Sequence, residues 1–537
     1  MNISKIKREK LLKNINILKE NIEKMSDNSR INELLSNLNE IETELTRKKY
    51  GLVYEEHSEE FDDFLEDSVP VLSEKHNLSS IDNSNVNFLL EGDNLASLYL
   101  LNKTHKNRIK LIYIDPPYNR GKKDFRYNDD YIKPEDGFKH SMWLSFMNKR
   151  LRLAKELLTA EGAIIISIDE YEFAQLKLLC DEIYGENNFI GAFIRKTKSS
   201  TNDADHFLNL QHEYALIYSK TNKFKFLGVP KETDKYKNPD KDPRGPWKSS
   251  DPSAKSGGPS TYFVIKNPYT GQEDFPPQGR YWAFSKDSLQ KYIDNGKIVF
   301  KKKIKNNERG FVFKSYLNEL RNDNKPIDSL AFIETNYMNQ VATKELNAFN
   351  LEFDYPKPVS FIKEIIQSST SGNDIILDFF AGTGTTGQAV IQANIESGDN
   401  RKFILCTNNE NEICEKVTLK RLIEFKRSIT DKFTIKYFKI DYYDKKNKMY
   451  YEYADKLLLH IKELVELENC INFDSDDTIK IVLSDDALDN LLLNIGDTKR
   501  IYVGHDVLMS ELQRNKLFLS KIEVKIIPDY YYSEFRG

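Results

Sequence analysis

The chain has 537 residues and a mass of 62.7 kDa, with 30% charged and 39% hydrophobic residues, a balance that excludes the fibrous and fully disordered classes. This length predicts about three or four domains, and no stretch approaches the roughly 18 consecutive apolar residues of a membrane-spanning helix. The N-terminus, MNISKIKREK, is charged where a secretory signal is apolar, so we expect a cytoplasmic protein. The four cysteines form no CxxC pair, which argues against a disulfide framework and against a zinc site.

The net charge of −4 hides an uneven distribution of charged residues. Residues 195–305 contain 22 lysines and arginines against 12 acidic residues, a net charge of +10, so the remainder of the chain is acidic. A basic segment on an acidic chain is typical of a surface that binds a polyanion. A solvated charged surface has the same composition, and charge alone leaves both interpretations open.

The first 85 residues are expected to form a helical segment. Leu34, Leu38, Ile41 and Leu45 recur at helical spacing with charged residues between them. This pattern fits a helical hairpin or a short coiled coil, and it fits an ordinary amphipathic helix on a core equally well. Residues 50–85 are acidic and irregular.

Between residues 86 and 225, apolar strands alternate with helices. Strands are expected at 87–91, 111–114 and 162–169, with helices at 94–102 and 143–158. Each of these strands is apolar throughout, as in sheets that are covered on both faces. The pattern therefore predicts an α/β fold with a doubly wound, largely parallel, Rossmann-like sheet.

Residues 226–344 interrupt this alternation and are predicted to be an insertion of loops and short strands. Nine of the 17 prolines lie between Pro230 and Pro277, a density that excludes long helices. The alternation resumes in residues 345–430, with strands expected at 374–380 and 402–406. Residues 431–537 are expected to form a C-terminal mixed α/β segment.

A glycine-rich turn follows the strand at 374–380 in the stretch DFFAGTGTTG (378–387). Glycine lets the backbone approach a ligand closely, and Gly382, Gly384 and Gly387 satisfy the GxGxxG pattern of nucleotide-like ligands. The pattern is weak evidence by itself, since a tight strand-to-helix turn without a ligand has the same residues.

The stretch Asp115-Pro116-Pro117-Tyr118 directly follows the strand at 111–114. Two prolines fix the backbone and remove two donors, which makes a rigid rim at the end of a strand, where ligands of this fold class bind. The Asp115 carboxylate and the Pro116 carbonyl are two acceptors suited to an exocyclic amino group, and Tyr118 offers a ring for stacking on a base. A strand stopped by proline beside a buried tyrosine is the structural alternative.

Together, DPPY and the DxFxGxGxT-like segment resemble the amino-methylating DNA methyltransferases that use S-adenosylmethionine. DPPY precedes the glycine-rich block with an insertion between them, an order similar to that of the beta group of adenine-N6 enzymes. The similarity is greatest to the modification (Mod) subunit of type III restriction-modification systems. It covers about residues 45–440, and the family-like stretches are KKYGLVYEE (48–56), NFLLEGDNLASL (87–98), IYIDPPYNRG (112–121), GRYWAFSKDSL (279–289) and FDYPKPVSFIKEII (353–366).

The resemblance implies an S-adenosylmethionine-dependent methyltransferase fold, with a catalytic half (86–225), a target-recognition insertion (226–344) and a cofactor-binding half (345–430). It assigns the flipped adenine to a catalytic set of Asp115, Pro116, Pro117 and Tyr118. The cofactor's methionine and ribose parts are assigned to Asp378, Phe379, Phe380, Gly382 and Gly384, its methionine end to Lys357 and Pro358, and its adenine amino group to Asp93. Asn409 or Glu410 is expected at the ribose hydroxyls, although many relatives place this carboxylate earlier.

The resemblance also implies site-specific methylation of adenine N6 in double-stranded DNA with flipping of the target base. The residues expected to bind DNA are Lys301, Lys302, Lys303, Lys305 and Arg280. The implied partners are a second copy of the chain and a restriction (Res) subunit, and an enzyme acting alone is equally compatible. The alternatives are a cytosine-N4 methyltransferase, a specificity subunit without catalysis and a nicotinamide dehydrogenase, which would explain the glycines but not DPPY.

Overall fold

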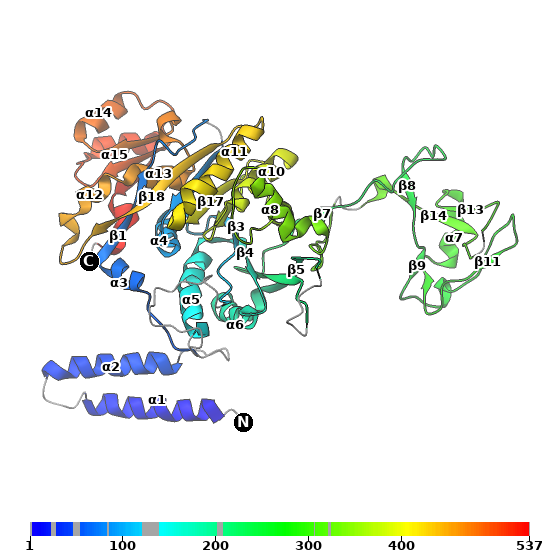
Figure 1. Cartoon of the computed structure of the whole chain (residues 1–537), viewed down its shortest axis with the longest axis horizontal. Helices are drawn as coiled ribbons and strands as arrows, with labels where there is room; N and C mark the ends of the chain where they lie inside the picture. Colours follow the sequence, from blue (N-terminus) through cyan, green and yellow to red (C-terminus); the bar gives the residue numbers. More distant parts are fainter. Residues whose placement is uncertain are drawn as a thin grey trace. The chain divides into compact units, whose positions relative to one another are not determined.

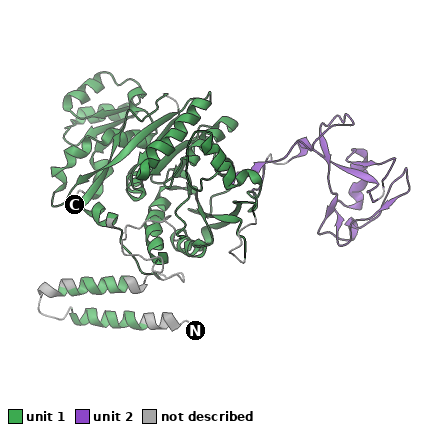
Figure 2. Cartoon of the chain, in the orientation of Figure 1, with its two compact units in different colours: residues 1–225, 328–537 green, residues 226–327 purple. Residues whose placement is uncertain are grey.

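A computed structural model of the chain describes residues 3–22, 28–46, 54–82, 85–120, 139–200, 208–305, 307–320 and 324–535. The chain divides into two compact units (Figure 2). Unit 1 comprises Met1–Lys225 and Asp328–Gly537, and unit 2 comprises Phe226–Ile327. Among the described residues, no helix combines the length and the apolar character needed to cross a membrane.

Unit 1 contains a nine-stranded sheet that is parallel through its centre (Figure 1). Five neighbouring pairs, from β18–β2 to β3–β4, are parallel, and antiparallel pairs lie only at the two edges, which confirms the predicted largely parallel α/β sheet. The strands in spatial order are β1 (Ser68–Glu74), β18 (Thr434–Asp444), β2 (Val86–Glu91), β17 (Lys402–Thr407), β16 (Ile375–Asp378), β3 (Ile109–Ile114), β4 (Leu158–Ile168), β6 (His212–Ser219) and β5 (Phe189–Lys196).

The central strands are buried on both faces because helices cover both. Every residue of β2 and β16 is buried, which explains their largely apolar sequences. One group of helices consists of α4 (Asn94–Thr104), α5 (Lys139–Leu157) and α6 (Phe173–Tyr184). The other consists of α9 (Val359–Ser369), α10 (Thr385–Ser397) and α11 (Lys420–Ser428).

The direction of the crossovers places these two groups on opposite faces. From β2 through α4 to β3, and on through α5 to β4, the chain moves toward the β5 edge of the sheet. From β16 through α10 to β17, and on through α11 to β18, it moves toward the β1 edge. Right-handed crossovers in opposite directions lie on opposite faces, and the strand order reverses between β3 and β16. In this fold class, ligands bind outside the carboxyl ends of the strands at such a reversal.

The main sheet extends beyond the boundaries expected from the sequence. Strand β1 lies within the predicted N-terminal segment 1–85 and β18 within the predicted C-terminal segment 431–537, yet β18 pairs with β2 and β1 pairs with β18. Val69 and Phe438 are buried in the same core as β2, so burial of apolar side chains accounts for the larger sheet.

The remaining C-terminal residues form a three-stranded parallel sheet with its own small core, centred on Leu488 and Val503. Its strands are β19 (Ile479–Val482), β20 (Arg500–Gly504) and β21 (Glu523–Ile527). The helices of this region are α12 (Ala454–Leu458), α13 (Ile461–Asn469), α14 (Asp485–Leu493), α15 (Glu511–Leu519) and α16 (Asp529–Tyr532).

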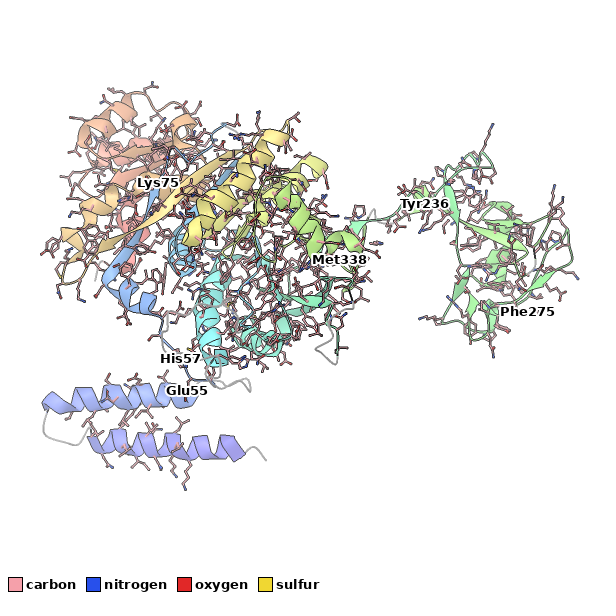
Figure 3. The ribbon with its side chains drawn as sticks, in the orientation of Figure 1. Glu55, His57, Lys75, Tyr236, Phe275 and Met338 are labelled. Atoms are coloured by element: carbon pink, nitrogen blue, oxygen red, sulfur yellow. The ribbon has the colours of Figure 1, made fainter. Side chains whose placement is uncertain are left out.

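At the N-terminus, α1 (Ile3–Ile22) and α2 (Asn28–Thr46) lie side by side as a hairpin (Figure 1). Figure 3 shows side chains of the two helices in the space between them. The hairpin agrees with one of the arrangements that the leucine spacing allowed. A short helix, α3 (Glu60–Asp67), leads into β1.

The described residues of unit 2 form short strands, two short 3-10 helices and the α-helix α7 (Lys286–Asp294) around a small core that includes Trp282 and Phe284. Its strands are β7 (Val229–Pro230), β8 (Trp247–Ser249), β9 (Ser253–Ala254), β10 (Ile265–Lys266), β11 (Glu273–Asp274), β12 (Tyr281–Trp282), β13 (Ile298–Phe300), β14 (Phe311–Tyr316) and β15 (Asn324–Lys325). The predicted insertion ran to residue 344, whereas unit 2 ends at Ile327. The residues that follow, including the start of α8 (Asn339–Asn347), belong to unit 1 because β5 binds them, for example through Ile194 N–H and the carbonyl of Ser329.

Candidate active site

The structure places the two predicted motifs at the carboxyl ends of neighbouring parallel strands. In the register of β16 and β3, Ile376 lies opposite Leu111 and Leu377 opposite Ile112. Asp378 ends β16, and Asp115 directly follows β3. The proline-flanked corner and the glycine-rich turn therefore meet across the point where the strand order reverses.

The DPPY corner is held by hydrogen bonds on both sides of its prolines. The Tyr118 hydroxyl donates to Asp115 Oδ1 at 2.7 Å, and the indole of Trp143 donates to the Pro117 carbonyl at 2.8 Å. Among the described residues, no hydrogen bond ends on the carbonyl of Pro116. The corner thus presents a carboxylate (Asp115), an uncommitted carbonyl (Pro116) and an aromatic ring (Tyr118) within four residues.

Lys357 links this corner to the segment that leads into α9. Its ammonium lies 2.8 and 2.7 Å from the two carboxylate oxygens of Asp115 and 2.9 Å from the Tyr118 hydroxyl. Lys357 was predicted, with Pro358, to lie at the methionine end of the cofactor. Its side chain is almost fully buried, and in this structure its charge is directed at the catalytic corner.

Two further charged residues, Arg195 and Glu213, extend the network and were not predicted from the sequence. Glu213 Oε1 lies 3.5 Å from the Lys357 ammonium, and Arg195 Nε donates to the same oxygen at 2.8 Å. Arg195 and Glu213 lie opposite each other in β5 and β6, and Arg195 also donates to the carbonyl of Tyr337. The one sequence signal was a charged residue within a largely apolar strand, which is rare unless the charge is paired.

These groups balance each other electrostatically. Burial alone would raise the pKa of Glu213, but Arg195 and Lys357 outweigh it and hold this pKa below its usual range. The pKa of the Tyr118 hydroxyl is raised well above its usual value by burial and by the charges of Asp115 and Glu213. Tyr118 therefore stays protonated and can donate to Asp115 throughout the neutral range.

The glycine-rich turn begins at Asp378, whose side chain orders the turn. Asp378 Oδ1 accepts from the backbone N–H of Phe380 at 3.0 Å, and Oδ2 accepts from the Thr386 hydroxyl at 2.6 Å. Burial raises the pKa of Asp378 to about 7, against the effect of these two hydrogen bonds, and the nearby charge of Asp115 adds to the rise.

Two glycines of this turn have backbone angles that other residues rarely adopt. Gly382 has φ of 48° and Gly384, which precedes α10, has φ of 75°. A Cβ atom at Gly384 would lie 3.0 Å from Thr418 Cγ2. Phe379 is fully buried, whereas Phe380 is partly buried and contacts Phe146.

The other residues predicted to bind the cofactor follow the next strands along the same edge. Glu91, at the end of β2, lies opposite Thr407, at the end of β17. Asp93 begins α4 and accepts from Leu95 N–H at 2.7 Å. After β17, Asn409 is half-buried and donates to Glu415, whereas Glu410 is exposed.

Unit 2 contains the residues predicted to bind DNA. Two of them pair within unit 2: Lys301 lies 2.9 Å from Glu308, and Arg280 lies 3.4 Å from Asp251 and donates to the Ser253 carbonyl. The side chains of Lys302, Lys303 and Lys305 are exposed. These three lysines are the members of the predicted set that offer exposed positive charge.

Comparison with known proteins identifies the family. A model of the N6/N4 family, described as DNA methylase, matches residues 109–420, more than half of the chain. The chain belongs to this DNA methylase family. The match includes both the DPPY corner and the glycine-rich turn, the two segments that the fold brings together.

Three relatives show how much of the chain is shared. The StyLTI Mod subunit of a type III restriction-modification enzyme from Salmonella typhimurium is 33% identical over 394 residues, which cover 66% of this chain and 58% of the relative. Type II methyltransferase M.KpnI from Klebsiella pneumoniae is 30% identical, over 63% of this chain and 84% of the relative. The EcoPI Mod subunit from Escherichia phage P1 is 30% identical, over 62% of this chain and 59% of the relative. The matches thus span about three fifths of the length of these Mod subunits.

Proposed function

We propose that this DNA methylase transfers a methyl group from S-adenosyl-L-methionine to N6 of a flipped adenine in double-stranded DNA. The observation that carries the proposal is the meeting of Asp115–Tyr118 with Asp378–Gly384 across the reversal of strand order. One corner offers acceptors and a ring for a base, and the other offers the tight turn that lets backbone approach a ligand.

The residues of the glycine-rich turn fit S-adenosylmethionine. A side chain at Gly384 would collide with Thr418, and Gly382 and Gly384 keep the turn narrow through their positive φ angles. Asp378 and Phe380 would bind the methionine and ribose parts, Asp93 the adenine amino group, and Asn409 or Glu410 the ribose hydroxyls. When bound, S-adenosylmethionine supplies an electrophilic methyl group on a sulfonium centre.

Asp115 and Pro116 would act on the target amino group. The lone pair of an adenine amino group is delocalised into the ring, so the nitrogen is a poor nucleophile. Hydrogen bonds from its two N–H groups to the Asp115 carboxylate and the Pro116 carbonyl favour a more tetrahedral and more nucleophilic nitrogen. Holding it in line with the methyl–sulfur bond contributes further, since orientation of two reactants is worth roughly 7–11 kcal/mol.

Lys357 leaves room for this role of Asp115. A carboxylate has about four acceptor positions, and Asp115 uses three of them for Tyr118 and Lys357. The remaining position on Oδ2 is available to an N–H of the base. Lys357 also fixes the orientation of the carboxylate and neutralises it, so that Asp115 accepts a hydrogen bond without being a strong base. As the N6–methyl bond forms, the methyl–sulfur bond would break with its electron pair left on sulfur, and the methylated, cationic nitrogen would readily lose one N–H proton to solvent.

Access to the base requires that it leave the duplex. The N6 atom of a paired adenine is not accessible inside a duplex, and extrusion of the base costs a few kcal/mol. Stacking on Tyr118 and the hydrogen bonds to Asp115 and Pro116 would offset this cost. Exposed lysines of unit 2, such as Lys302 and Lys303, would bind phosphates, while other side chains of that unit read base edges.

The proposal extends to the type III assembly named in two of the relatives. The chain would then be the modification subunit of a type III restriction-modification system, with a homodimeric state and a restriction subunit as partner. The identities of about 30% to the StyLTI and EcoPI Mod subunits support this assignment.

The test is the chemical identity of the product. The purified chain is incubated with duplex DNA and S-adenosylmethionine labelled in the methyl group, and the DNA is digested to nucleosides for mass spectrometry. N6-methyladenine is the expected product. N4-methylcytosine would replace the adenine assignment by the second specificity of this family, and the absence of label in DNA would overturn the enzymatic proposal. Methylation-aware sequencing of the same DNA then gives the sequence context.

A further inference from the structure

The N-terminal hairpin buries only one of its two apolar stripes. The inner stripe runs along the line where α1 and α2 meet and includes Ile15, which is buried, and the half-buried Leu12, Leu35 and Leu38. Lys19 of α1 binds Asn39 and Glu42 of α2 along this line. These positions recur at the three- and four-residue spacing of helices that pack along their length.

A second stripe lies beside the first and is exposed. Leu11, Leu18, Leu34 and Ile41 are 47%, 49%, 40% and 50% exposed. Each directly precedes a position on the line between the helices, and one residue corresponds to about 100° around a helix. Because α1 and α2 run in opposite directions, this rotation brings both halves of the second stripe to the same face of the hairpin.

Together the two stripes form an apolar surface that is wider than two helices can bury against each other. Helices that pack against one partner need a narrow apolar seam, whereas helices of a four-helix bundle need about three apolar positions in seven. Short helices gain most of their stability from packing of the apolar face. The hairpin therefore has the apolar surface expected of one half of a four-helix bundle.

The charges of the two helices indicate what completes the bundle. Helix α1 carries six lysines and arginines against two glutamates, and α2 carries one arginine against four glutamates. Two copies of the hairpin can face each other around a two-fold axis parallel to the helices, which places α1 of each copy over α2 of the other. A two-fold axis perpendicular to the helices would instead place the two basic α1 helices over each other, with like charges adjacent.

We propose that the exposed face of the hairpin, formed by Leu11, Leu18, Leu34 and Ile41, binds the same face of a second copy of this chain. The two hairpins form an antiparallel four-helix bundle in which each basic α1 packs on an acidic α2. The interface is isologous, since the same residues contribute from both copies. This inference specifies where the proposed homodimer is held and does not depend on the reaction at the active site.

The first test replaces the second stripe in the full-length chain. Sedimentation velocity over a range of concentrations should show a dimer for the native chain. Leu18→Asn with Ile41→Asn should weaken dimerisation at least about tenfold, while helix content by circular dichroism and the midpoint of thermal unfolding stay close to native. The matched control is Ile17→Asn, because Ile17 is 47% exposed but lies away from both stripes. A monomeric native chain, or a doubly substituted chain that dimerises as tightly as the native one, would overturn the inference.

The second test uses the charges beside the stripe. Lys10 directly precedes Leu11, Glu40 directly precedes Ile41, and both side chains are exposed. Within one hairpin they lie at opposite margins of the face, whereas the proposed bundle brings each to the margin that its helix shares with the oppositely charged helix of the second copy. Lys10→Glu and Glu40→Lys should each raise the dimer dissociation constant at low salt, and the double reversal should restore it. If the double variant dimerises no more tightly than the two single variants, the result would contradict the pairing of α1 with α2.

Discussion

The ammonium of Lys357 lies 2.7 Å from one carboxylate oxygen of Asp115 and 2.8 Å from the other, although the two residues are 242 positions apart in the sequence. The pair connects the segment before α9 with the corner after β3, and unit 2 is inserted between these two parts of the chain. Because Glu213 and Arg195 complete the network, two carboxylates and two cations neutralise each other in a largely buried cluster. The first two predictions concern this cluster.

Replacing Asp115 should separate catalysis from cofactor binding. Asp115→Ala removes one of the two acceptors proposed for the target amino group, so we expect methyl transfer to fall by at least about 100-fold. Binding of S-adenosylmethionine, measured by isothermal titration calorimetry, should stay within a few-fold of native because the glycine-rich turn is unchanged. A variant that keeps near-native activity would exclude the proposed role of Asp115.

Replacing Lys357 should distinguish two roles for this residue, orientation of Asp115 and contact with the methionine end of the cofactor. In Lys357→Met, Arg195 is the one cation of the cluster left to pair with the carboxylates of Asp115 and Glu213. Because breaking a buried ion pair costs about 3 kcal/mol or more, we expect the free energy of unfolding to decrease by this amount. If Lys357 positions Asp115, kcat should fall by about tenfold or more with little change in the KM for S-adenosylmethionine.

The control for Lys357→Met is Lys363→Met in α9, the helix that begins two residues after Lys357. Lys363 is partly exposed and pairs with Glu396, away from the Asp115 cluster. A variant of Lys357 whose KM for S-adenosylmethionine rises while kcat stays native would instead support contact with the methionine end of the cofactor.

The pKa of Asp378 gives a pH dependence of stability. With a folded-state pKa of about 7, the folded chain binds a proton at Asp378 that the unfolded chain has released above about pH 4. Stability relative to Asp378→Asn should therefore decrease as the pH rises from 5 to 7 and stay level above that range. The expected total is about 2–3 kcal/mol.

Urea unfolding of the native chain and of Asp378→Asn at pH 5, 6, 7 and 8 measures this dependence. Asparagine can still accept from Phe380 N–H, so the turn should keep its fold. An unfolding free-energy difference that is constant over this range would contradict a raised pKa at Asp378.

Charge reversal in unit 2 should weaken DNA binding and make the affinity less dependent on salt concentration. Lys302, Lys303 and Lys305 are exposed, and each phosphate contact that is lost reduces the slope of log K against log salt by about 0.9. Reversal of all three to glutamate should reduce both affinity and slope, whereas Lys301→Glu should have a smaller effect because Lys301 is paired with Glu308.

The control for this experiment reverses three exposed lysines of unit 1, Lys432, Lys499 and Lys521, and changes the net charge equally. Fluorescence anisotropy with a duplex oligonucleotide at several salt concentrations compares the variants. If both triple variants bind equally, net charge rather than a site in unit 2 governs binding.

The sequence was sufficient to predict the centre of the sheet and the two corners. β2, β3, β16 and β17 are largely apolar, DPPY directly follows β3, and DFFAGTGTTG begins at the last residue of β16, so strand type and site position could both be predicted from local pattern. The meeting of the corners also followed, because parallel strands of one sheet present their carboxyl ends at one edge.

The edges of the sheet and the charged network could not be predicted in this way. β1 and β18 contain many polar residues, and only their long-range pairing with each other and with β2 shows that they extend the main sheet. Arg195 and Glu213 lie 18 positions apart in an antiparallel pair, and their proximity depends on a register that sequence periodicity does not determine. Lys357 was recognised as a site residue, but its contact with Asp115 arises from tertiary packing.

The strand order has a consequence for synthesis. β16 and β17 separate β2 from β3 in the finished sheet, yet the ribosome makes them only after unit 2 has been translated. Until residue 407 has been added, a nascent chain holds β2 and β3 with apolar edges that lack their native neighbours, and direct pairing of these two strands is a competing outcome. We therefore expect translation pauses within unit 2 to decrease the yield of native protein more than pauses near the C-terminus.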